Sequence, residues 1–183
     1  MPGVDGDKRL VLAAANELDE YFDSSQLLWR LSDRAGSLSP GSLLLALKCT
    51  KARMESENEP GLRSAVEKID ILIQKRRGIW QKRIKDEVPY RLRLWKNALE
   101  DFFDEGMLDQ SIANQIRNRV MLELLKDEAF TLAPSFQTQI DQLDRRLRPF
   151  FMEEGFLWEE SLRDEFDIQQ FWFLYLRLGE VKS

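Results

Sequence analysis

Apolar residues recur along most of the chain at steps of three and four positions, the spacing that places side chains on one face of an α-helix. A first stripe begins at Leu10 and ends at Phe22. Further stripes lie at 43–54, 62–84, 92–102, 112–124 and 136–147. No run shows the alternation of a β-strand bounded by hairpin turns. The pattern predicts an all-α fold, a helical bundle of six to eight helices.

Prolines set the expected ends of the central helices. Pro40 and Pro60 are expected helix starts, because proline at the first helical position loses no needed hydrogen bond. The stripe at 62–84 predicts one long helix that runs from Pro60 to about Glu87. Pro89 is expected to separate it from the next helix, since proline inside a helix removes a backbone donor.

Two shorter helices are expected on weaker patterns. The run from Asp23 to Leu31 combines capping side chains with leucines and predicts a short second helix that is closed by Gly36. Near the C-terminus, Asp167 is expected to cap a last helix that continues through Leu178.

The length of 183 residues and a hydrophobic fraction of 43% are typical of one helical domain spanning 1–183. Residues 1–7 carry acidic side chains and no apolar stretch, so we expect them to be disordered and not to be a signal peptide. Apolar runs such as 10–15 and 171–176 are far shorter than the ~20 residues that a membrane-spanning helix needs. We therefore expect a soluble, cytoplasmic protein without a membrane partner.

The C-terminal segment 150–183 is rich in aromatic residues. Nine of the nineteen aromatic residues of the chain lie between positions 150 and 175, among seven acidic residues. Aromatic side chains dominate both protein cores and protein interfaces. The favoured interpretation is that this segment packs back on the bundle and seals it. The alternative is an interface with a partner or a second copy, for which Trp158, Trp172 and Phe173 are the candidate residues.

Charge is unevenly distributed along the chain, whose net charge is −5. Positions 62–99 hold eleven basic and four acidic residues, and the basic ones are interleaved with aromatic residues between 75 and 96. This combination is typical of nucleic-acid or other polyanion binding, with Arg76 and Arg83 as candidates. However, Trp80 and Trp95 lie on the apolar stripes of their helices, which favours core packing instead.

The absence of histidine and the presence of a single cysteine exclude several chemistries. A Ser-His-Asp or Cys-His arrangement and any histidine-ligated metal site require residues that the chain lacks. One cysteine cannot form an internal disulfide, and a buried, inert thiol is the expected state of Cys49. Neither GxGxxG nor a phosphate-binding loop ending in GK[ST] occurs, and no cofactor is expected.

Carboxylate pairs are the remaining catalytic candidates. Asp101 and Asp104 are three positions apart, so they share a helix face that could hold Mg²⁺. The run from Glu100 to Asp104 resembles the aspartate-rich motif of isoprenoid synthases, but no companion metal motif occurs. The acidic face of Glu17, Glu20 and Asp23 is similar to the carboxylate helices of all-α nucleotide pyrophosphatases. Solvated helix faces often carry acidic pairs at this spacing, and that interpretation is favoured for both sets.

The sequence as a whole favours a non-catalytic module for protein interaction or self-association over an enzyme. The expected partner is another protein or a second copy of the chain, as in a homodimer. The alternatives are a nucleic-acid-binding module that uses the basic region 75–96 and a magnesium-dependent enzyme that uses helix carboxylates.

Overall fold

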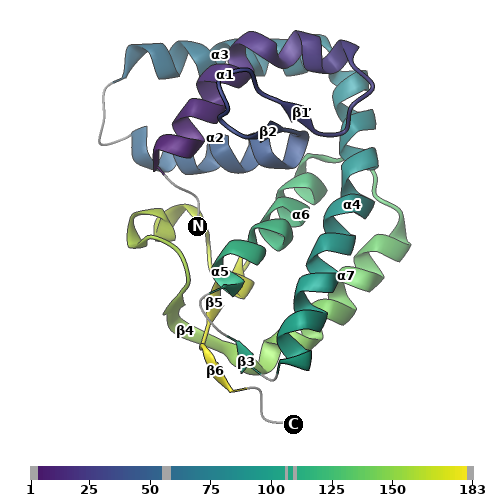
Figure 1. Cartoon of the computed structure of the whole chain (residues 1–183), viewed down its shortest axis with the longest axis vertical. Helices are drawn as coiled ribbons and strands as arrows, with labels where there is room; N and C mark the ends of the chain where they lie inside the picture. Colours follow the sequence, from purple (N-terminus) through teal and green to yellow (C-terminus); the bar gives the residue numbers. More distant parts are fainter. Residues whose placement is uncertain (1–3, 55–58, 106, 109–110, 181–183) are drawn as a thin grey trace.

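A computed structural model describes residues 4–54, 59–105, 107–108 and 111–180, and within these ranges the chain forms seven α-helices and three two-stranded antiparallel ladders (Figure 1). The α-helices are α1 (Val4–Asp23), α2 (Pro40–Met54), α3 (Pro60–Lys75), α4 (Arg77–Asp104), α5 (Ile112–Gln115), α6 (Arg117–Glu128) and α7 (Pro134–Leu147). The ladders pair β1 (Trp29–Arg30) with β2 (Ser37–Leu38), β3 (Met107–Leu108) with β6 (Gly179–Glu180), and β4 (Phe151–Phe156) with β5 (Tyr175–Leu176). Three 3₁₀ turns complete the described elements: η1 (Arg148–Phe150), η2 (Glu160–Glu165) and η3 (Trp172–Leu174). The predicted all-α, multi-helix fold is confirmed.

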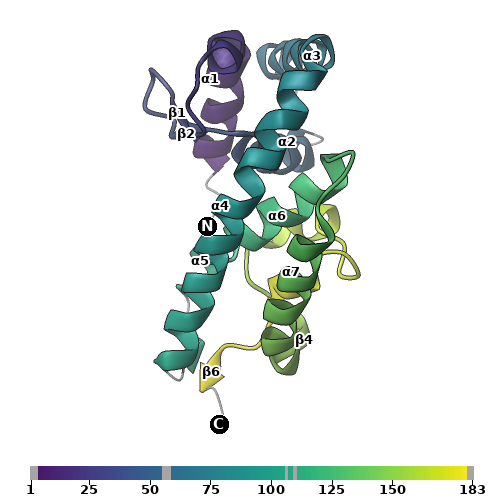
Figure 2. The same ribbon diagram turned by 90° about the vertical axis from the view of Figure 1, so that its right-hand side faces the viewer.

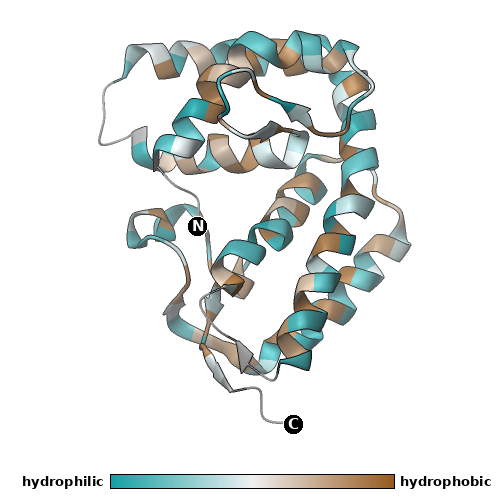
Figure 3. Cartoon of the chain, in the orientation of Figure 1, coloured by the Kyte–Doolittle hydropathy of each residue, from teal (hydrophilic) through white to brown (hydrophobic). Residues whose placement is uncertain are grey.

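The helices form two tiers that α4 connects. The upper tier in Figure 1 holds α1, α2, α3 and the β1–β2 hairpin, and the lower tier holds α5, α6, α7 and the C-terminal strands. In Figure 2, α4 runs through both tiers and lies beside α7 in the lower one. Figure 3 shows apolar residues interspersed with polar ones along each helix, as expected of helices with one buried face. Their buried side chains form one connected hydrophobic cluster.

The long central helix is divided at a different point from the one predicted. Arg76 leaves helical geometry, with φ −112° and ψ 30°, and α3 and α4 meet there at a sharp bend. The prediction of one helix from Pro60 to Glu87 is therefore wrong. Pro89 instead lies inside α4, on its exposed side, where water can satisfy the carbonyl that proline leaves without a donor.

The segment after α1 forms a hairpin and not the predicted short helix. Glu17 on α1 accepts hydrogen bonds from Trp29 Nε1 at 2.9 Å and from Ser32 Oγ at 2.6 Å, which hold the segment against α1 in extended form. Gly36, expected to end a helix, turns the hairpin instead with a φ of +116°, which favours glycine.

The N-terminal expectation is also corrected. Residues 4–7, expected to be disordered, form the first turn of α1, while residues 1–3 lie outside the described part of the chain. Asp7 is buried and accepts a hydrogen bond from Arg53 of α2 at 3.1 Å. The contact ties the start of α1 to the end of α2.

The aromatic C-terminal segment packs back on the bundle, as predicted. Phe166, Phe171 and Phe173 are fully buried, and their rings meet edge to face. The expected last helix from Asp167 does not form. Asp167 does accept hydrogen bonds from the next backbone N–H groups, as a cap would, but the chain then continues through η3 into β5, which pairs with β4.

A buried polar network fixes the start of α2, where the predicted helix start at Pro40 is confirmed. The Glu87 carboxylate accepts hydrogen bonds from Ser39 Oγ, Gly41 N and Arg91 Nε, each at 2.7 Å. A Cβ at Gly41 would lie 2.9 Å from Glu87 Oε1, so only glycine allows this approach. The carboxylate therefore neutralises the positive end of α2 from within the core.

Candidate functional site

The structure places the two candidate arginines in internal contacts. Arg83 is buried, and its guanidinium donates hydrogen bonds to the backbone oxygens of Tyr21 at 3.1 Å and Gln26 at 2.6 Å, at the end of α1. Arg76 forms ion pairs with Asp19 and Asp23. A partner that bound either guanidinium would compete with these bonds, and the interaction role of both residues stays a prediction.

The three aromatic candidates lie inside the C-terminal packing. Trp158 is buried and donates a hydrogen bond from Nε1 to the Ala113 oxygen at 2.9 Å. Trp172 and Phe173 are buried as well, and the guanidinium of Arg119 lies 4.0 Å from the centre of the Phe173 ring. These side chains contribute to the core of the chain, and their role in a partner interface stays a prediction.

The carboxylate candidates do not converge. Asp101 and Asp104 are exposed on α4. Among the described residues, no group of three or more histidine, cysteine, aspartate or glutamate side chains is placed to hold a metal ion. On α1, Glu17 is engaged with the β1–β2 hairpin and Asp23 with Arg76. Neither acidic set is thus joined by ligands from a second element.

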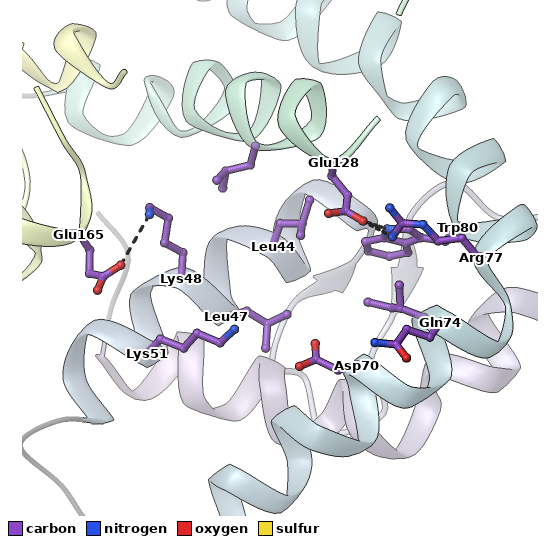
Figure 4. A pocket seen from close by; sticks show the side chains of 12 residues that line it. Leu44, Leu47, Lys48, Lys51, Asp70, Gln74, Arg77, Trp80, Glu128 and Glu165 are labelled. Atoms are coloured by element: carbon purple, nitrogen blue, oxygen red, sulfur yellow. Dashed lines mark hydrogen bonds and ion pairs between the residues drawn. The ribbon is translucent and has the colours of Figure 1, made fainter. Parts of the chain in front are cut away.

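A hollow of about 450 Å³ lies between the two tiers (Figure 4). Helices α2, α3, α4 and α6 and the turn η2 supply its walls. Leu44, Leu47, Ile73, Trp80 and Leu124 form its apolar lining. A volume of this size is within the range of small-molecule sites. We call it the tier cleft.

The charges around the tier cleft compensate one another. Lys48 Nζ lies 3.6 Å from Glu165, and Arg77 is paired with Glu128, which also accepts a hydrogen bond from Trp80 Nε1 at 3.1 Å. Figure 4 shows these pairs on opposite sides of the cleft, with Lys51 and Asp70 between them. The rim thus balances three cations against three carboxylates, so it selects neither an anionic nor a cationic ligand.

A second, shallower hollow follows the line between α4 and α7. It consists of two adjoining parts of about 370 and 230 Å³ that share Phe136 as a lining residue. Pro89, Leu92 and Leu132 add apolar surface to it. Phe130, whose side chain is 71% exposed, lies in the loop that leads into it. We call this hollow the α4–α7 groove.

All charged residues that line the α4–α7 groove are basic, namely Lys85, Arg93 and Lys96. Lys82 is exposed one helical turn before Lys85 on α4. We call these four residues the basic face. Asp86 is the one exposed acidic residue between positions 82 and 97. Lys96 also lies 3.7 Å from Glu100, but both side chains are about half exposed, so this pair is weak.

The basic region that the sequence indicates is divided between the core and the surface. Arg83 and Arg91 are buried, whereas Lys82, Lys85 and Arg93 are exposed. The helical period carried this signal. The exposed side of α4, away from its apolar stripe, follows three- and four-residue steps through Lys82, Lys85, Pro89, Arg93 and Lys96. Arg83 and Arg91 flank the stripe.

Comparisons with protein-family models, with curated proteins and with solved structures find no match for this chain. Within the described residues, no helix is both long and apolar enough to cross a membrane.

Proposed function

We propose that the chain is a non-catalytic binding module whose basic face, together with the α4–α7 groove, receives an acidic segment of a partner protein. The observation that carries this proposal is the uniform sign of the charges lining the groove, in a chain whose net charge is −5. Like charges clustered along a groove attract and orient a partner of opposite charge. The tier cleft has no comparable excess.

The apolar content of the groove favours a protein over a nucleic acid. Leu92, Leu132 and Phe136 offer contacts for apolar side chains between the cations. A single-stranded nucleic acid would instead require several exposed rings for its bases. The indole rings of Trp80 and Trp95 are buried in the core, which leaves Phe130 as the exposed ring beside the groove among the described residues. An amphipathic acidic segment matches both properties of the groove.

The test measures the anisotropy of a fluorescein-labelled acidic peptide in which glutamates alternate with leucines at helical spacing. The groove variant is Lys85→Gln/Arg93→Gln, and the control is Arg63→Gln/Lys75→Gln, which removes the same two residue types from exposed positions on α3. Two exposed ion pairs of about 0.5–1 kcal/mol each correspond to a loss of affinity of roughly five- to thirtyfold. The control variant is expected to bind within about twofold of the wild type, since its charges lie outside the groove.

Two results would contradict the proposal. One is the absence of any binding at about 50 mM salt, where screening is weak. The other is equal loss in the groove and control variants, which would mean nonspecific attraction. A single-stranded DNA probe is measured in parallel. If only the DNA binds, and the groove variant loses it, the polyanion alternative replaces the protein partner.

A further inference from the structure

The chain also carries an acidic surface that complements the basic face. Five exposed carboxylates lie on β4 and on or next to η2: Glu153, Glu154, Glu160, Asp164 and Asp167. A shallow hollow lined by Glu153, Asp164 and Asp167 brings three of them together. Arg163 is the one basic residue lining this hollow, and it is paired with Glu160. We call the five carboxylates the acidic face; with Arg163 counted, the surface keeps an excess of negative charge.

Apolar side chains project next to the acidic face. Phe151 and Met152 on β4 are 40% and 37% exposed, immediately before Glu153 and Glu154 in the sequence. Exposed large apolar residues beside charged ones are typical of docking surfaces. Two apolar side chains with neighbouring carboxylates complement the α4–α7 groove, because the groove places apolar side chains between cations.

The two surfaces cannot meet within one molecule. Figure 1 shows α4 and α7 on the right of the lower tier, and β4 with the segment that follows it on the left. A contact between different surfaces of identical chains is heterologous, so a pair of copies joined by one contact keeps one free basic face and one free acidic face. Such a contact repeats from copy to copy, either as an open chain or as a closed ring.

We infer that the partner of the basic face is a second copy of this chain, which presents its acidic face and the side chains of Phe151 and Met152 to the α4–α7 groove. The inference rests on the proposed function and names its partner. Charge complementarity is its basis: both surfaces belong to the same chain, with four cations on one and five carboxylates on the other. The assembly is head to tail, and salt weakens it.

Sedimentation equilibrium of two variants and of their mixture tests this directly. The basic-face variant is Lys85→Glu/Arg93→Glu, and the acidic-face variant is Glu153→Gln/Asp164→Asn. All four side chains are exposed, so both variants are expected to fold. The acidic-face variant carries amides and not lysines, so that the glutamates introduced into the basic-face variant find no new cations on it. Each variant alone has lost one face and is expected to be monomeric at 21.5 kDa.

An equimolar mixture of the variants is expected to form a dimer and nothing larger. The basic-face variant retains its acidic face, and the acidic-face variant retains its basic face, so one contact can form and no second one can follow. The wild type at the same concentration is expected to form assemblies larger than the dimer in about 50 mM salt. Its dissociation constant is expected to rise at least tenfold in about 500 mM salt. Arg63→Gln/Lys75→Gln serves as the control and is expected to assemble like the wild type.

Three outcomes would overturn the inference: a monomeric wild type at low salt, self-association that neither variant weakens, or a mixture that stays monomeric. If the wild type is monomeric but the acidic peptide still binds and the groove variant loses it, the partner is another protein and the proposed function stands. If neither self-association nor peptide binding occurs, both proposals fail.

Discussion

The buried carboxylate of Glu87 provides the sharpest test of the packing described here. Its side chain is fully buried and accepts three hydrogen bonds, from Ser39, Gly41 and Arg91. In Glu87→Ala all three donors lose this acceptor, and the guanidinium of Arg91 keeps only its weaker bonds, to Asn118 Oδ1 and Ser39 Oγ at 3.1 Å. The network therefore changes from fully satisfied to partly satisfied.

The expected loss in the free energy of unfolding is about 3–5 kcal/mol, because removing one partner of a buried ion pair leaves the other charge uncompensated. Domains of ordinary size have a total of about 5–15 kcal/mol, so Glu87→Ala is expected to unfold at a markedly lower urea concentration. Glu87→Gln keeps the shape of the side chain. Its amide group must turn an N–H toward either Gly41 or Arg91, which are donors, and we expect a loss of about 2 kcal/mol.

Urea unfolding followed by circular dichroism at neutral pH measures these losses, with an unchanged m value as the check that the native state is intact. Glu87→Leu/Arg91→Met removes both charges together and is expected to be more stable than the sum of its single substitutions predicts. A loss below about 1 kcal/mol in Glu87→Ala would refute the argument, since it would mean that the carboxylate does not organise the start of α2.

Two further predictions concern single groups. Although burial alone would raise it, the hydrogen bonds from Ser32 and Trp29 lower the pKa of the Glu17 carboxyl, so its stabilisation is present at neutral pH and lost as the pH falls. Glu17→Gln is therefore expected to cost about 1 kcal/mol in urea unfolding at pH 7 and progressively less as the pH falls toward 3; an equal cost at both values would contradict the assignment. Burial raises the pKa of the Cys49 thiol to about 12, so a disulfide reagent at pH 8 is expected to react quickly with unfolded chain and only slowly with native chain. Rapid, stoichiometric labelling of the native protein would show that Cys49 is accessible.

Local signals were sufficient for most of the helices. Pro40, Pro60 and Pro134 each begin a helix, and the apolar stripes of α1 and α7 correspond to their buried faces. Such features depend on a few neighbouring residues, which a sequence displays directly.

Contacts between distant residues explain what the sequence did not reveal. The segment after α1 has helix-compatible leucines, but the carboxylate of Glu17 binds Trp29 and Ser32 and favours the extended form. Similarly, the apolar stripe continues from α3 into α4. The chain bends at Arg76 because the two helices pack in different directions. Tertiary packing of this kind overrides local helix propensity.

The candidate site was predictable only in part, for a related reason. The excess of basic residues between 62 and 99 is visible in the sequence, but its distribution between core and surface depends on partners elsewhere in the chain. Arg83 is held in the core by a hydrogen bond to the end of α1, and Arg91 by a hydrogen bond to Glu87. The residues that remain exposed, Lys85 and Arg93, are those for which the fold supplies no internal carboxylate contact within the described residues.

Helix α4 has a consequence for how the molecule loses its structure. It is 28 residues long, about 42 Å at 1.5 Å per residue, and serves both ends of the protein. Near its start Trp80 packs edge to face on Phe22 of α1, and near its end Phe103 lies against Phe150. When heat or denaturant unfolds one tier, the end of α4 that packs there loses its apolar contacts. The other tier then loses support from the same helix. Melting is thus expected as one all-or-none event, and proteolytic halves of the chain should not survive alone.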